Sequence, residues 1–84
     1  MISFKMYDVV EVQHPTHPRN GTRGVIGGML AADGEIMGYS VRFADDMEMV
    51  DPDDLEYTGL SITEQDFDHG PWPPAVLSKD SSAT

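Results

Sequence analysis

The sequence contains no cysteine and few basic residues. Without cysteine the chain can form neither a disulfide bond nor a thiolate metal site, and nothing favours an oxidising compartment. Its five Lys and Arg residues stand against fifteen Asp and Glu residues, which gives a formal net charge of −10 at pH 7. Because binding to nucleic acid depends on cations that neutralise phosphates, this balance argues against direct binding to nucleic acid or to an anionic membrane.

Long apolar stretches are also missing. A membrane-spanning helix needs about 20 consecutive, mostly apolar residues, and the apolar runs here are only a few residues long. The first eight residues lack the apolar core of a signal peptide. We therefore expect a cytoplasmic protein, and its 84 residues make one small domain.

Short β-branched and aromatic segments, separated by turn residues, fill the first 59 residues. They predict five strands, at residues 7–12, 23–30, 35–43, 47–50 and 56–58. Asp33-Gly34 is a strong hairpin signal, and Pro52 ends the fourth segment before a helical turn at residues 53–55. The glycines at positions 24, 27 and 28 predict a bulge or a strongly bent second strand. Five short strands joined by tight turns indicate an all-β fold, a small barrel whose closure removes exposed sheet edges.

The third segment indicates where the core lies. Its apolar residues Tyr39, Val41 and Phe43 alternate with Ser40 and Arg42, so one face should be buried and the other wet. We expect the barrel core to contain Tyr39, Val41, Phe43, Val10, Val12, Val25 and Leu55, with Met47 and Met49 as further candidates.

The composition changes after Gly59. We expect one or two helical turns within residues 60–69, with Ser61 or Thr63 as the N-cap and an acid three residues later. The proline-rich stretch at 71–74 must be extended, and we expect disorder after residue 78. Trp72 is either a lid that packs back onto the barrel or an exposed polyproline-type docking peptide. We favour the lid, because an exposed Trp lowers solubility.

The most unusual segment is an acidic window with seven carboxylates in twelve residues and no base: Asp45, Asp46, Glu48, Asp51, Asp53, Asp54 and Glu56. Charges that keep the protein soluble and guard strand edges explain two or three of these residues, and less easily all seven. Like charges about 7 Å apart along a strand face repel by roughly 0.5 kcal/mol in water, and no local Lys or Arg offsets this cost. Opposite a cationic partner the same charges would speed association and form complementary pairs. We therefore predict that the acidic window binds a partner.

Residues for chemistry are scarce. His14 and His17 lie three positions apart in a proline-interrupted loop without the further ligands that a metal site needs. Asp51, Asp53 and Asp54 lack the central Gly and the terminal Glu of a calcium loop. No Ser and His form a recognisable catalytic motif, and the glycines do not follow a phosphate-binding pattern. We expect no enzymatic activity, no metal and no cofactor.

Four runs of residues are similar to a known family: residues 4–10 (FKMYDVV), 23–28 (RGVIGG), 38–43 (GYSVRF) and 54–59 (DLEYTG). Residues 4–59 resemble the small all-β immunity family numbered thirty-one of bacterial polymorphic toxin systems, with elements shared by SH3-like barrels in general. The resemblance implies a five-stranded SH3-like barrel over residues 1–59 with a C-terminal extension over 60–84. It also implies a cytoplasmic antidote that binds and blocks a cognate toxin domain. Acidic immunity proteins suit nuclease toxins, whose substrate grooves are basic.

One alternative of a different class is a non-catalytic SH3-like module that reads peptides or serves as an accessory part of a larger assembly. Such modules present clustered aromatic side chains. The sequence has only three Phe, three Tyr and one Trp, and several of these are needed for the core. Tyr7 and Trp72 are the pair that could form a peptide groove. A small hydrolase or metal enzyme is the least favoured alternative.

Overall fold

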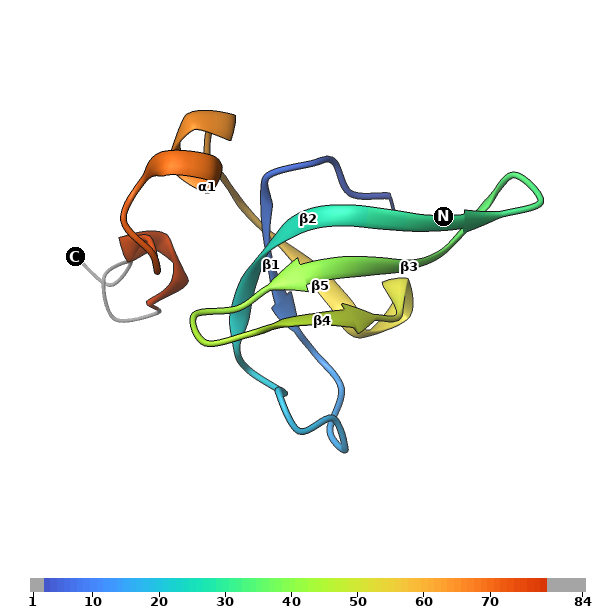
Figure 1. Ribbon diagram of the computed structural model, residues 1–84. Helices are drawn as coiled ribbons and strands as arrows, with labels where there is room; N and C mark the ends of the chain where they lie inside the picture. The colour runs from blue at the N-terminus through green and yellow to red at the C-terminus, as the bar shows by residue number, and fades with distance from the viewer. Residues whose placement is uncertain (1–2, 79–84) are drawn as a thin grey trace.

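A computed structural model describes residues 3–78, which are built around five antiparallel strands (Figure 1). The strands are β1 (Asp8–Val12), β2 (Arg23–Ala32), β3 (Glu35–Arg42), β4 (Met47–Val50) and β5 (Leu55–Ser61). Three short helical segments complete the fold: η1 (Pro52–Asp54), α1 (Glu64–His69) and η2 (Ala75–Leu77). Within residues 3–78, no helix has the length and apolar character needed to cross a membrane. The prediction of a small, mostly β domain with five strands is confirmed.

The strands form one sheet in the order β4-β3-β2-β1-β5. Strands β1 to β4 pair with their neighbours in sequence, and β5 returns to pair with β1. The sheet is strongly curved in Figure 1. Since β4 and β5 stand at opposite ends of the order, strand pairing within residues 3–78 does not close the sheet into a barrel.

Bulges produce part of this curvature. The register between β2 and β3 shifts at Gly27, between the pairs Ile26–Val41 and Gly28–Ser40, so the bulge that the glycines predicted is present. The pairing of β1 with β5 is also interrupted, in a stretch where Gly59 has a φ of +87°. An extra residue in one strand increases its local twist and bends it. The sheet can thus wrap around a core of modest size.

One cluster of buried residues fills the inner face of the sheet: Phe4, Val10, Val12, Ile26, Tyr39, Val41, Phe43, Val50 and Leu55. Six of the expected core residues belong to it. Met47 and Met49 do not, because they are 47 % and 56 % exposed, and the expectation that they fill the core was wrong. Side chains alternate along β4, and Val50 is the residue of this edge strand that is buried.

The opposite face of the sheet is covered as well. Val9 and Val25 are paired across β1 and β2 and fully buried, but lie outside the main cluster. Alternation along the strands directs them to the outer face. The segment after β5 packs there: the Phe67 ring lies over Gly27, where an added Cβ would come within 2.9 Å of it. The domain therefore has two apolar layers, of which the inner one is larger.

The C-terminal segment begins later than expected. Strand β5 continues to Ser61, so the expected boundary at residue 59 falls within a strand. Thr63, one of the two expected N-caps, caps α1. Its hydroxyl accepts a hydrogen bond of 3.0 Å from the amide of Asp66. The expected disorder after residue 78 lies outside the described residues.

Candidate functional site

The acidic window spans the β3–β4 turn, β4, η1 and the start of β5. The turn is closed by a hydrogen bond of 2.6 Å from the Phe43 amide to the Asp46 carbonyl oxygen. Asp46 also accepts a hydrogen bond of 2.8 Å from the Met47 amide through its side chain. This turn places Asp45 and Asp46 at one end of the sheet, whereas η1 carries Asp53 and Asp54. The seven carboxylates consequently occupy different electrostatic environments.

Arg19, from the loop between β1 and β2, neutralises part of the window. Its Nη1 lies 2.7 Å from Asp45 Oδ1, and its Nε lies 2.6 Å from Glu48 Oε2. The hydrogen bond from Arg19 holds the pKa of Asp45 below its ordinary value, and the bonds to Asp45 and Glu48 raise the pKa of Arg19. The guanidinium also lies 4.6 Å from the centre of the Phe43 ring. No Lys or Arg near in sequence offsets these charges, as expected, but the distant Arg19 offsets two of them.

No spacing in the sequence signals this pairing, because Arg19 and Asp45 are 26 residues apart. The loop that carries Arg19 is ordered by its own contacts. Asn20 Oδ1 accepts a hydrogen bond of 2.9 Å from the His14 amide, and the Arg19 amide donates one of 3.0 Å to His17 Nδ1. Both histidines thus help to shape the loop. Among residues 3–78, no three His, Asp or Glu side chains are grouped closely enough to hold a metal ion.

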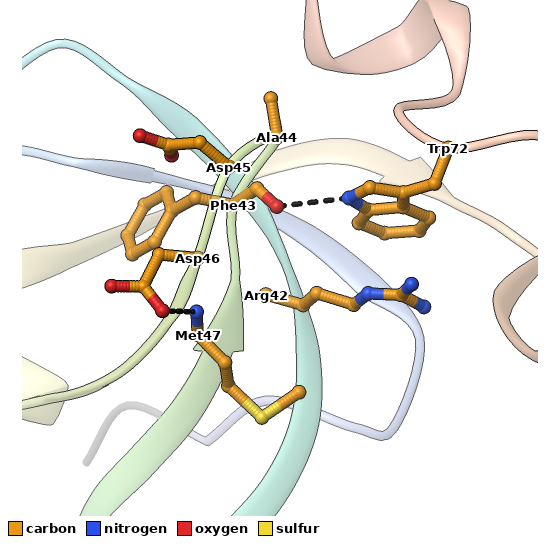
Figure 2. Close-up of a pocket in the computed structure, with 7 residues that line it drawn as sticks. All are labelled: Arg42, Phe43, Ala44, Asp45, Asp46, Met47 and Trp72. Carbon is orange, nitrogen blue, oxygen red and sulfur yellow. Dashed lines mark hydrogen bonds between the residues drawn. The ribbon is translucent and has the colours of Figure 1, made fainter.

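Arg42 takes no part in the acidic window. Figure 2 shows its side chain beneath the Trp72 ring, while the carboxylates of Asp45 and Asp46 point to the other side of the turn. The Arg42 guanidinium lies 3.8 Å from the centre of the Trp72 ring and donates a hydrogen bond of 2.8 Å to the Phe67 carbonyl oxygen. The face of β3 that was expected to be wet is therefore partly covered.

Trp72 has the role expected of a lid. Its side chain is half-buried, and its Nε1 donates a hydrogen bond of 2.9 Å to the Phe43 carbonyl oxygen (Figure 2). Phe67 lies between Trp72 and Tyr7, with its ring centre 5.8 Å from one and 5.4 Å from the other. The peptide groove that Tyr7 and Trp72 could have formed is thus filled by the protein's own Phe67.

Two further carboxylates of the window lie close to other charged side chains. Asp54 Oδ1 is 4.0 Å from His14 Nε2, and its side chain is 21 % exposed. Glu56 stands directly opposite Glu11 on β1, and Glu11 Oε1 lies 3.6 Å from Arg23 Nε. Asp54 is therefore partly shielded, and Glu56 lies at the edge of a mixed charged cluster.

Four carboxylates of the window, Glu56 included, are available to solvent. Asp46, Asp51, Asp53 and Glu56 are all exposed, and none forms an ion pair with a base of the described chain. The acidic window thus has two parts. Asp45 and Glu48 are paired with Arg19, whereas the four exposed carboxylates face solvent. Asp51 and Asp53 are the members of the second part that flank a groove.

This groove lies between η1 and the hairpin formed by β2 and β3, and has a volume of about 510 Å³. We call it the hairpin groove; its principal lining residues are Glu35, Ile36, Met37, Asp51, Pro52 and Asp53. Ile36 and Met37 were not recognised as site residues from the sequence. They follow Glu35, the first residue after the Asp33-Gly34 turn, and the available signal was two adjacent apolar residues where a half-buried strand would alternate.

Comparisons of the chain with protein-family models, with curated proteins and with solved structures gave no match. The function must therefore be inferred from the residues and their geometry.

Proposed function

We propose that this protein is an immunity protein, which binds a bacterial toxin domain and neutralises it without catalysis of its own. The observation that carries the proposal is the exposed part of the acidic window. Asp46, Asp51, Asp53 and Glu56 have no ion pair within the described chain, and the whole protein has a net charge of −10. Such a surface favours a cationic partner.

Exposed carboxylates of this kind affect the rate at which the two proteins associate. They create a negative potential that steers a cationic partner toward the surface and raises the association rate. Asp45 and Glu48 contribute less, because Arg19 already holds them. The partner surface that suits these charges is a basic cleft, such as the substrate groove of a nuclease toxin.

We also infer that the sheet belongs to the SH3-like barrel class. Three features support this inference: the meander from β1 to β4, the η1 turn before β5, and the return of β5 to β1. The resemblance of residues 4–59 to the immunity family supports the same assignment and a cytoplasmic location.

The experiment that tests the function starts from the neighbouring gene, which on this proposal encodes a large protein with a basic, toxic C-terminal domain. Co-expression with the present chain should protect cells, and the purified proteins should form a stoichiometric complex whose association slows as salt is added. The triple variant D46N/D51N/D53N should bind at least about tenfold more weakly, a loss of roughly 1.4 kcal/mol.

The matched control is E64Q/D66N/D68N, which removes the same charge from three exposed residues on α1. Equal protection and equal affinity of the two triple variants would rule out the acidic window as the interface. A neighbouring operon of metabolic enzymes, with no toxin domain, would favour the accessory module instead.

A further inference from the structure

Half of the outer edge of β3 has no partner strand within the described chain. β4 pairs with β3 only from Tyr39, opposite Val50, to Arg42, opposite Met47. Of the preceding residues, Glu35, Ile36 and Gly38 pair with β2 alone, and the register shifts at Met37. The chain leaves the sheet after Val50 because Pro52 begins η1, and proline cannot donate to a strand ladder. A gap in the strand pairing of the described chain therefore continues the line of β4.

The hairpin groove lies at this opening, and its floor is apolar. Ile36 and Met37 line it and are 38 % and 51 % exposed. Met29 and Leu30, on the other strand of the same hairpin, are 44 % and 51 % exposed. Apolar side chains gathered on an exposed surface commonly mark an interaction site. Ile36 and Met37 lie on β3, the strand with the open edge, which favours an occupant in extended conformation.

The acidic residues that line the groove favour a positively charged occupant. Glu35, Asp51 and Asp53 line it and are exposed, and none of the three forms an ion pair with a base of the described chain. Among residues 3–78, no basic side chain lines the groove. An acidic segment would be repelled here, whereas Lys or Arg side chains would meet three carboxylates around an apolar floor.

We propose that the hairpin groove binds an extended segment of a partner protein in which Lys or Arg alternates with apolar residues. The segment adds to the open edge of β3 as a further strand. Ile36 and Met37 are consecutive, yet both line the groove, at the register shift between the pairs Leu30–Gly38 and Ala31–Ile36. Because side chains alternate along the added strand, its apolar residues cover this floor while its cations face the acidic rim. The proposal rests on the proposed function and specifies the part of the toxin that is recognised.

The test is an NMR titration of the complete, ¹⁵N-labelled chain with a synthetic peptide of alternating Lys and Leu, roughly six residues long, the usual length of a strand. Amide shifts should change at residues 34–38 and at Asp51 and Asp53, since Pro52 has no amide proton. A Lys–Ser peptide of equal length should bind more weakly, because it lacks the apolar contacts, and a Glu–Leu peptide should not bind. Shifts centred on Asp45 and Glu48 instead, or equal binding of the Lys–Leu and Lys–Ser peptides, would overturn the groove assignment, as would no binding.

A pair of matched variants gives the second measurement. M37S/D53N should weaken peptide binding at least about tenfold, whereas M49S/D68N makes the same two changes outside the groove and should not. Both variants should retain the dispersed amide spectrum of the folded protein. Equal affinity of the two variants for the peptide would contradict the proposal.

The same variants separate this inference from the proposed function. If the toxin domain binds M37S/D53N and M49S/D68N equally well, the groove assignment is wrong while the immunity function stands. If the peptide binds in the groove but no toxin domain binds the protein, the groove assignment stands and the immunity function is wrong.

Discussion

The guanidinium of Arg42 lies 3.8 Å from the centre of the Trp72 ring, and this contact joins β3 to the segment that follows α1. Arg42 also donates a hydrogen bond to the Phe67 carbonyl oxygen, while Trp72 donates one to that of Phe43. Arg42 and Trp72 thus stack on each other. Arg42 also binds the main chain of α1, and Trp72 binds the main chain directly after β3. The part of the chain from Phe67 to Trp72 is therefore packed on the sheet.

Replacing Trp72 by Ala should lower the free energy of unfolding by about 3 kcal/mol, the lower end of the range for large aromatic truncations, since the side chain is half-buried. Urea unfolding followed by circular dichroism measures the change. The control Trp72→Phe keeps an aromatic ring but loses the Nε1 donor, and should cost about 1 kcal/mol. Unchanged stability of W72A would show that the segment does not pack on the sheet in solution.

Gly27 makes room for Phe67. An added Cβ at Gly27 would lie 2.9 Å from Phe67 Cζ, closer than real Cβ contacts, so Gly27→Ala should destabilise the protein by about 1–3 kcal/mol. At the neighbouring Gly28 the nearest atom would be Ser40 Cβ at 3.4 Å, and Gly28→Ala should cost less. The second change F67L should restore part of the stability of G27A. Equal thermal unfolding of the two alanine variants would contradict this account of the bulge.

The hydroxyl of Tyr39 forms a buried hydrogen bond in the core. It accepts a hydrogen bond of 3.0 Å from the amide of Phe4, and both residues are buried. Tyr39→Phe would leave that amide without its partner, which should cost about 1–3 kcal/mol in chemical denaturation. Tyr57→Phe removes the same atom from a side chain that is 50 % exposed and should change little. A neutral result for Y39F would mean that water or another group satisfies the Phe4 amide.

The pairing of Asp45 with Arg19 should appear in the pH dependence of stability. The hydrogen bond from Arg19 lowers the pKa of Asp45 below its ordinary value of 3.8. A carboxylate whose pKa is lower in the folded state stabilises the protein above its unfolded pKa, and this stabilisation is lost as the pH falls through the folded pKa. The difference in thermal stability between wild type and D45N should therefore be largest near neutral pH and shrink as the pH falls below 3.8.

The double-mutant cycle supplies the control for this pH effect. In an R19Q background, D45N should no longer produce a difference that depends on this pairing. A pH dependence of D45N that is the same with and without Arg19 would assign it to another contact of Asp45.

The strands and much of the core could be predicted from the sequence. The bounds of β4 match the expected residues 47–50, because Pro52 follows closely and proline stops a ladder. Tyr39, Val41 and Phe43 alternate with polar residues, and all three are buried as expected. These features depend on local residue patterns, which is why they could be predicted.

The errors concern contacts between distant parts of the chain. Met47 and Met49 follow the same alternation as a core strand, but the order of the sheet leaves β4 at its edge. Arg42 was expected on a wet face, which Trp72 and Phe67 partly cover from about 25–29 residues away. Arg19 contacts the acidic window from a loop that precedes Asp45 by 26 residues. Such pairings are set by the tertiary structure, and no local pattern encodes them.

The hairpin of β2 and β3 extends beyond the rest of the sheet, as Figure 1 shows, and every residue from Met29 to Met37 is exposed. Its hydrogen bonds are therefore not protected by packing on both sides. Amide protons in this arm should exchange with solvent through local opening, at a lower free-energy cost than those of Val10 or Val41 in the core. The arm can fluctuate and become ordered against another molecule while the body of the protein stays folded.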